Sequence, residues 1–169
     1  MFRNRFAVAA ATAAATAVLV ASPTFAGSAH FIGNLTKASL DGTSLVVQFK
    51  EAGLESGSVE TVVVQAHLDA TYQCINNGGT NPPDAKKTTI SSDVSNSGTF
   101  PANKNGQIQG SMSIAIPSAT SVLSCPGGQT ATLTAGTWSS IWVSDTTSGA
   151  TLGLKGSFSF GAPVGHGHK

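Results

Sequence analysis

The longest regular feature of the sequence is an alternation of two residue sets that runs from Val62 to Cys74. A period of two is typical of a strand with one buried face, whereas the apolar positions of an amphipathic helix recur every three to four residues. The buried face is expected to carry Val62, Val64, Ala66, Leu68, Ala70, Tyr72 and Cys74, and the solvent face Val63, Gln65, His67, Asp69, Thr71 and Gln73. This segment therefore predicts a β protein with a long central strand.

Shorter segments of the same period lie on both sides of this strand. Turn signals at Asp41-Gly42 and at Lys104-Asn105-Gly106 favour hairpins, because these residue types tolerate positive φ. The other expected strands cover residues 35–40, 44–51, 88–96, 108–116, 130–145 and 151–160. Seven to nine antiparallel strands without an amphipathic helix predict an all-β, immunoglobulin-like β-sandwich, with a closed barrel as the alternative.

The two tryptophans belong to the segment 130–145, which is expected to form one long strand or two short ones broken near Gly136. Trp138 and Trp142 are an even number of residues apart, so we expect them on the same face. On an exposed face such aromatics would stack on sugar rings. A sandwich of this size needs large core side chains, so at least one tryptophan is expected in the core.

The first 26 residues have the pattern of a secretory signal peptide, with Arg3 and Arg5 before an apolar run that is too short to span a membrane. Small residues allow cleavage after Ala26 or after Ala29. The sandwich domain is expected to cover residues 30–160, followed by a flexible tail at 161–169. We therefore predict a secreted, extracellular protein without a membrane span.

Removal of the signal peptide also removes every arginine and leaves seven lysines against eight acidic residues, a net charge of −1. Arginine is the residue most used for bidentate recognition of phosphate. A nearly neutral chain without it provides no electrostatic surface for a nucleic acid. No nucleic-acid partner is therefore expected.

An even pair of cysteines in an oxidising compartment predicts a disulfide between Cys74 and Cys125. The loops 75–86 and 118–129 adjoin the two cysteines, so the bridge is expected to hold them as one rigid surface. The candidate binding residues on these loops are Asn76, Asn77, Asp84 and Gln129.

No catalytic constellation is recognisable in the sequence, which lacks a Gly-x-Ser-x-Gly motif. The acidic residues Glu51, Glu55 and Glu60 lie around one turn, and the aspartates Asp69, Asp84, Asp93 and Asp145 are dispersed. Nothing in their spacing selects the pair of carboxylates that a glycosidase needs, so we expect solvated acids. We predict no catalytic residue, no cofactor and no enzyme activity.

Two histidines support an alternative with copper. Cleavage after Ala29 would make His30 the amino terminus, which supplies an amine and an imidazole to one copper ion, as in the secreted oxygenases with a histidine brace. His67 would be a second ligand if the fold brought it close. The main expectation is that both side chains are exposed and that no metal is bound.

Several segments resemble small secreted actinobacterial proteins of unknown function, namely His30-Phe31-Ile32, Phe49-Lys50-Glu51-Ala52-Gly53-Leu54, Thr71-Tyr72-Gln73-Cys74 and Ser124-Cys125-Pro126-Gly127-Gly128-Gln129. This likeness covers most of the mature chain and implies no known activity. Asp41-Gly42-Thr43, the alternating Leu45, Val47 and Phe49, and Gly53-Leu54-x-x-Gly57 are similar to the neocarzinostatin-type chromophore carrier proteins. That resemblance implies a secreted immunoglobulin-like sandwich with a cleft for a ligand.

Together these features predict a secreted, non-catalytic β-sandwich that acts as a surface or ligand-binding module, with an extracellular ligand, glycan or protein as its partner. A monomer is expected. The alternatives are a copper redox protein or oxygenase that uses His30, and a carrier of a small apolar molecule.

Overall fold

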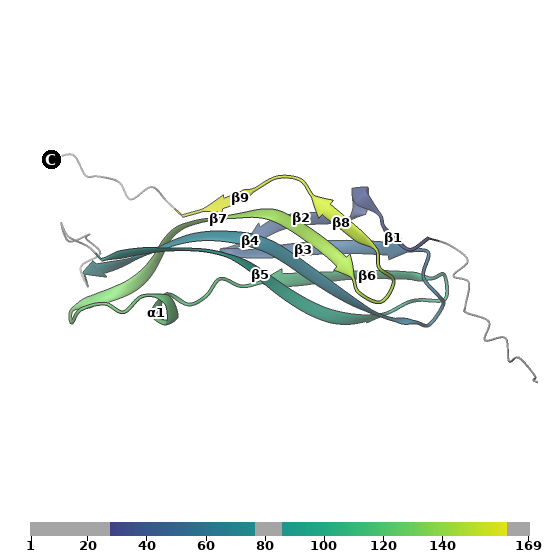
Figure 1. The fold of residues 1–169 in the computed structure, drawn as a ribbon, viewed down its shortest axis with the longest axis horizontal. Coiled ribbons are helices and arrows are strands. Elements are labelled where there is room, and N and C mark those ends of the chain that lie inside the picture. Colours follow the sequence, from purple (N-terminus) through teal and green to yellow (C-terminus); the bar gives the residue numbers. More distant parts are fainter. Residues whose placement is uncertain (1–27, 77–85, 162–169) are drawn as a thin grey trace, which may run out of the picture.

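The fold is a sandwich of two antiparallel sheets, shown by a computed structural model that describes residues 28–76 and 86–161 (Figure 1). The strands are β1 (His30–Phe31), β2 (Lys37–Asp41), β3 (Ser44–Ala52), β4 (Val59–Asn76), β5 (Lys87–Pro101), β6 (Gln107–Ile114), β7 (Gln129–Asp145), β8 (Thr151–Leu154) and β9 (Phe158–Phe160). The helical segments are the 3-10 turn η1 (Gly33–Leu35) and the one-turn helix α1 (Ala119–Val122). The predicted antiparallel sandwich with one disulfide is confirmed.

Each sheet is organised around long strands. In the first sheet, β3 pairs with β6 from Leu45 to Ala52, while β1 and β2 share its other edge. In the second sheet, β4 lies between β5 and β7, and β8 and β9 share the outer edge of β7. Since β4 crosses the whole sandwich, its two ends define the two ends of the molecule (Figure 1).

The core forms between the two sheets, as the alternation predicts. Every residue expected on the buried face of β4 is at most 1% exposed. β3 contributes Leu45, Val47 and Phe49 from the facing sheet, and all three are fully buried. Polar atoms of the core aromatics have partners, since the Tyr72 hydroxyl donates to the Pro117 carbonyl at 2.8 Å.

The disulfide joins Cys74 and Cys125 with a Cα–Cα distance of 5.6 Å, which confirms the predicted pair. It lies at the end of β4, next to the loop that carries α1. Fourteen residues separate Cys74 from Glu60 near the start of the same strand, which is roughly 45 Å of extended chain. The disulfide and the start of β4 therefore occupy opposite ends of the sandwich.

The prediction that Trp138 and Trp142 share a face is wrong. Trp138 is fully buried, with its indole N–H donating to the Thr43 carbonyl at 3.0 Å, whereas Trp142 is 54% exposed. The reason is a β-bulge, in which Ser140 adopts φ 47° and the register against β4 shifts between Gln65 and His67. One additional residue on β7 reverses which face the following side chains occupy. The expectation that at least one tryptophan is in the core is confirmed.

Smaller differences concern the edges. The segment 151–160 forms two strands rather than one, and β1 was not predicted. The loop 118–129 contains the helix α1, and 33–35 is a 3-10 turn that precedes β2. Among residues 28–76 and 86–161, no helix has the length and apolar character that crossing a membrane requires.

Candidate ligand pocket

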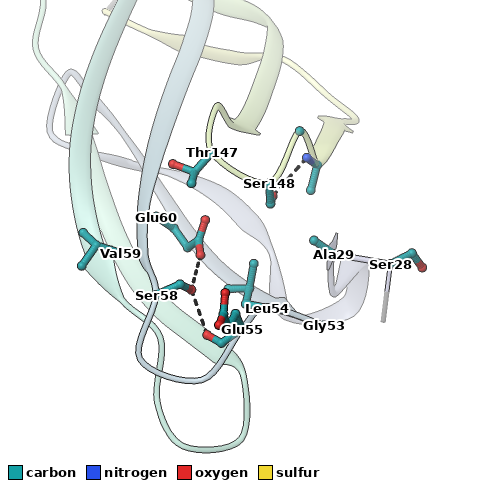
Figure 2. A pocket seen from close by; sticks show the side chains of 12 residues that line it. Ser28, Ala29, Gly53, Leu54, Glu55, Ser58, Val59, Glu60, Thr147 and Ser148 are labelled. Carbon is teal, nitrogen blue, oxygen red and sulfur yellow. Dashed lines mark hydrogen bonds between the residues drawn. The ribbon is translucent and has the colours of Figure 1, made fainter. Parts of the chain in front are cut away.

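A pocket of about 740 Å³ opens at the end of the sandwich where β4 begins (Figure 2). Three segments that are distant in sequence form it: the start of the described chain, the loop between β3 and β4, and the loop between β7 and β8. The lining residues are Ser28, Ala29, Gly53, Leu54, Glu55, Ser58, Val59, Glu60, Thr147, Ser148, Gly149 and Ala150. This volume falls in the range of sites for small molecules.

The loop between β7 and β8 is held by hydrogen bonds within itself and to β4. The Asp145 carboxylate accepts from the Thr147 amide at 2.8 Å, and the Asp145 carbonyl accepts from the Gly149 amide at 2.9 Å. The Thr146 amide donates to the Thr61 carbonyl at 2.9 Å. This wall of the pocket is therefore anchored to the sheet.

The opposite wall is the loop between β3 and β4. The Leu54 amide donates to the Gly106 carbonyl at 3.0 Å, and the Ser58 amide donates to the Glu55 carbonyl at 3.2 Å. Gly53 has φ 83°, and a Cβ there would lie 2.7 Å from the Ser28 carbonyl oxygen. Glycine at this position lets the segment that contains Ser28 pack against the loop and complete the pocket.

Beneath the pocket, three carboxyl groups from three strands are buried together. Glu51 on β3 is fully buried, Glu60 on β4 is 3% exposed and Asp145 on β7 is 1% exposed. Asp145 raises the pKa of both Glu51 and Glu60, so its carboxyl group lies close to both glutamates. We call these three residues the carboxyl cluster.

Each member of the carboxyl cluster has one oxygen with a hydroxyl or amide donor and one without. Ser148 donates to Glu51 Oε1 at 2.8 Å, and Ser58 donates to Glu60 Oε1. The second oxygens, Glu51 Oε2, Glu60 Oε2 and Asp145 Oδ2, are buried and accept no bond from such a donor. Because carboxylates only accept, contacts among these oxygens are favourable only when the cluster retains protons.

Burial and mutual repulsion keep protons on the carboxyl cluster. Burial is the main cause that raises the pKa of Glu51 from 4.5 to about 7, and the charges of Asp145 and Glu60 raise it further against the lowering effect of the Ser148 bond. Burial likewise raises the pKa of Glu60, with Asp145 adding to the increase and the Ser58 hydroxyl opposing it. Glu51, beneath the pocket, therefore exchanges its proton near neutral pH, and Glu60 at the pocket floor retains its proton to a higher pH than an exposed glutamate does.

The expectation of solvated acids is wrong for these three residues. On β3, Glu51 continues the series of alternate, buried positions that contains Leu45, Val47 and Phe49. On β7, Asp145 continues the buried series of Ile141 and Val143 in the same way. Glu60 precedes Val62 on the buried parity of β4. The alternation therefore indicates that all three acidic side chains are buried. The spacing along the chain does not indicate that the three strand ends meet. Glu55 is exposed, as expected, and lines the pocket.

Two of the four candidate binding residues of the disulfide loops, Asn76 and Gln129, are described, and they lie at the other end of the molecule. Asn76 and Gln129 pair at the ends of β4 and β7, and Gln129 lines a smaller pocket of about 310 Å³ beside Cys125. Asn77 and Asp84 lie outside the described residues. Within the described residues, the structure therefore brings Asn76 and Gln129 together.

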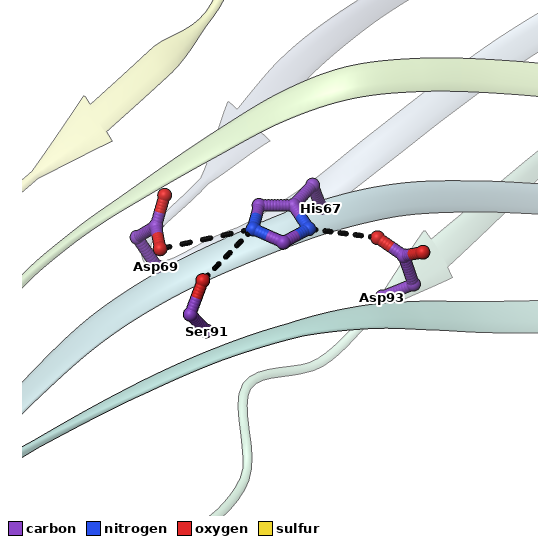
Figure 3. Close-up of polar contacts among 4 residues, drawn as sticks. All are labelled: His67, Asp69, Ser91 and Asp93. Carbon is purple, nitrogen blue, oxygen red and sulfur yellow. Dashed lines mark hydrogen bonds and ion pairs between the residues drawn. The ribbon is translucent and has the colours of Figure 1, made fainter.

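The two histidines considered for copper belong to different sheets. His30 is exposed on β1, and its Nδ1 is 2.8 Å from the Ser28 carbonyl oxygen. His67 lies on the outer face of β4, where its Nδ1 donates to Asp93 at 2.7 Å and its Nε2 is 3.0 Å from the Ser91 hydroxyl (Figure 3). The bond to Asp93 and the charge of Asp69 raise the pKa of His67. In the described part of the chain, no group of three or more His, Cys, Asp or Glu side chains is placed to hold a metal ion.

No protein family matches the sequence, and no curated protein matches it. The geometry of the pocket and of the exposed faces therefore indicates what this chain can bind.

Proposed function

We propose that the protein is a secreted, non-catalytic β-sandwich that binds a small ligand in the pocket above the carboxyl cluster. The observation that carries this proposal is the position of Glu60, which lines the pocket and has a buried oxygen without a hydroxyl or amide donor. A buried acceptor without a donor costs about 1–3 kcal/mol. A ligand that supplies the donor recovers this free energy on binding.

Burial of the cluster favours binding over catalysis. A general acid or nucleophile must reach the reacting atom of its substrate. Glu51 and Asp145 are buried and do not line the pocket, so their carboxyl groups do not contact a molecule in it. Glu60 alone lines it, together with hydroxyl groups that are suited to orient a ligand.

The described segment at the start of the chain supports cleavage after Ala26 rather than after Ala29. Ser28 and Ala29 line the pocket, and the Ser28 carbonyl oxygen contacts the His30 ring. A mature chain that begins at Gly27 keeps this wall, whereas one that begins at His30 loses it. The intact mass of the secreted protein tests this, because a start at His30 would contradict the proposal and favour the copper alternative.

An NMR screen of small fragments tests the proposed site. We expect ligands to shift the amide signals of Gly53, Ser58, Ser148 and Gly149 in a saturable manner. The amides of Asn76 and Gln129 at the disulfide end are the internal control and should not move. If ligands shift only the amide signals at the disulfide end, the pocket is not the binding site. The loops beside the cysteines would then be the site.

A second candidate function, glycan binding, is favoured by the exposed face of Trp142. A Cβ at Gly153 would lie 3.1 Å from the indole ring, so the ring lies over a residue without a side chain. Gln65, exposed on the neighbouring strand, is in register with Trp142. An exposed indole beside a polar amide is suited to stack on a sugar ring and bind its hydroxyls.

Glycan binding is tested with immobilised polysaccharides and the variant Trp142→Ala. We expect any binding through this face to fall at least tenfold in the variant. Leu35→Ala removes another exposed apolar side chain and is the matched control, which should bind as the wild type does. Equal binding by all three proteins would contradict a role for Trp142.

A further inference from the structure

We propose that the ligand of the pocket carries a protonated amine, and that its ammonium group binds the Glu60 carboxylate at the pocket floor. This inference rests on the proposed function and names the chemical class of its ligand. It goes beyond the presence of acidic residues, because it depends on a buried oxygen without a donor that belongs to a residue lining the pocket.

The charges around the pocket have one sign. Glu55 and Glu60 are acidic, and the described residues that line the pocket include no lysine, arginine or histidine. The other polar side chains of the lining are the hydroxyls of Ser28, Ser58, Thr147 and Ser148. An anionic ligand would meet repulsion here without a compensating cation, whereas an ammonium group meets attraction.

The donors of an ammonium group match the acceptors on the floor. Ammonium has three N–H donors and no acceptor, whereas Glu60 Oε2 is a buried acceptor without a hydroxyl or amide donor. Hydrogen bonds between charged partners are shorter and stronger than neutral ones. Because the Ser58 hydroxyl already donates to Glu60 Oε1, it holds the carboxylate in place before the ligand arrives.

The pocket also has room for an apolar portion of the ligand. Leu54, Val59, Ala29 and Ala150 line it together with the polar groups. A volume of about 740 Å³ holds an amine with an alkyl or small ring substituent. A short alkylamine is therefore a suitable first probe.

Uptake of the cation is expected to release protons from the carboxyl cluster. The titratable groups that face the site are Glu51 on β3, Glu55 on the loop, Glu60 on β4 and Asp145 on β7, with His30 adjacent through Ser28. A bound ammonium stabilises the ionised carboxylates and so displaces the protons that burial retains. Binding should therefore be stronger at pH 8 than at pH 5.

The first experiment compares n-butylammonium, n-butanol and butyrate as probes of one size and three charges. NMR titrations of the full mature protein at pH 7 report the site and the affinity. We expect n-butylammonium to shift the amides of Ser58 and Ser148 and to bind at least tenfold more tightly than either other probe. Calorimetry in phosphate and in HEPES should give different apparent enthalpies, because released protons are taken up by the buffer.

Variants test whether the ammonium group binds the Glu60 carboxylate itself or responds only to the overall negative charge of the protein. Glu60→Gln removes the carboxylate at the floor and should weaken n-butylammonium binding at least fivefold. Asp69→Asn removes the same charge from the outer face of β4 and should change the affinity less than twofold. Glu51→Gln, which leaves Glu60 in place, should abolish most of the buffer dependence. If the Glu60 variant does not fold, the Glu51→Gln variant still tests whether amine binding releases protons from the carboxyl cluster.

The outcomes distinguish this inference from the proposed function. Equal binding of n-butanol and n-butylammonium at the pocket amides would overturn the amine and leave the pocket as a ligand site. Binding of Ca²⁺ at these amides without binding of the amine would also overturn it. If the neutral, anionic and cationic fragments all fail to shift these amides, the proposed function itself is contradicted.

Discussion

Glu51 and Asp145 belong to opposite sheets, and both carboxyl groups are buried at the same end of the sandwich, where the charge of Asp145 helps burial to raise the pKa of Glu51. Two ionised carboxylates buried close together repel each other, so a proton retained on Glu51 relieves the repulsion. Asp145 also raises the pKa of Glu60, which belongs to β4. The contact between the two sheets at this end of the molecule therefore depends on protonation.

The first prediction concerns pH and stability. The pKa of Glu51 is raised to about 7 in the folded protein from 4.5, so its stabilising effect is fully present below pH 4.5 and is lost as the pH rises to about 7. We expect the free energy of unfolding to fall by about 3 kcal/mol between pH 4.5 and pH 8 from this residue alone. Thermal or urea unfolding measured across this range checks the expected loss.

The matched variants for this prediction are Glu51→Gln and Glu55→Gln. Glu51→Gln should remove most of the pH dependence, because the buried amide does not titrate. Glu55 is exposed, so its variant should keep the dependence of the wild type. A wild-type protein that becomes more stable from pH 5 to pH 8 would contradict the cluster.

The second prediction concerns the disulfide. Cys74 and Cys125 are 51 residues apart, and a closed loop of this size stabilises a protein by about 4 kcal/mol in the chain-entropy model. The double variant with alanine at both positions should lose about that much in urea unfolding. The amide signals of Ser58 and Ser148 at the opposite end should stay unchanged in the folded variant. Large shifts there would contradict the separation of the two ends.

The third prediction concerns the bulge in β7. Ser140 has φ 47°, a conformation that costs a residue with a side chain roughly 1 kcal/mol relative to glycine. Ser140→Gly should therefore raise the free energy of unfolding by up to about 1 kcal/mol, whereas Ser140→Val should lower it. Ser139→Gly, at the neighbouring position in ordinary strand geometry, is the control and should be destabilising. Destabilisation by Ser140→Gly would argue against the bulge.

The fourth prediction separates the two tryptophans. Trp138→Phe removes buried volume and leaves the Thr43 carbonyl without its donor, so we expect a loss of about 2–4 kcal/mol. Trp142→Phe should change stability by less than about 0.5 kcal/mol, because the ring is half exposed. Acrylamide should quench the fluorescence of the Trp138→Phe protein, which retains Trp142, far more than that of the Trp142→Phe protein. Similar quenching of both would contradict the bulge.

The fold is predictable from the sequence because burial and strand period are linked. The alternation in 62–74 places each side chain on one of two faces, and the structure follows it at every buried position. The disulfide also agrees with the prediction from the even count of cysteines and the expected oxidising compartment. The bulge at Ser140 was missed because no glycine or other sign of positive φ marks that position in the sequence.

The pocket was not predictable in the same way, although part of its signal was present. The alternation along the strands places Glu51, Glu60 and Asp145 on buried faces. Buried carboxyl groups are rare in proteins, so this placement was a usable sign of a special site. Their proximity depends on how the ends of β3, β4 and β7 meet across the two sheets. That relation is a property of the tertiary packing, which no local pattern encodes.

The most direct test of the account is a carbon-13 NMR titration of the Glu51 side-chain carboxyl group in the mature protein. The account predicts a midpoint near pH 7 for Glu51, well above that of an exposed glutamate, because burial beside Asp145 and Glu60 disfavours its charge. A midpoint near 4.5 would mean that the group is solvated or paired with a cation. That result would contradict the buried carboxyl cluster and, with it, the proposed basis of ligand binding.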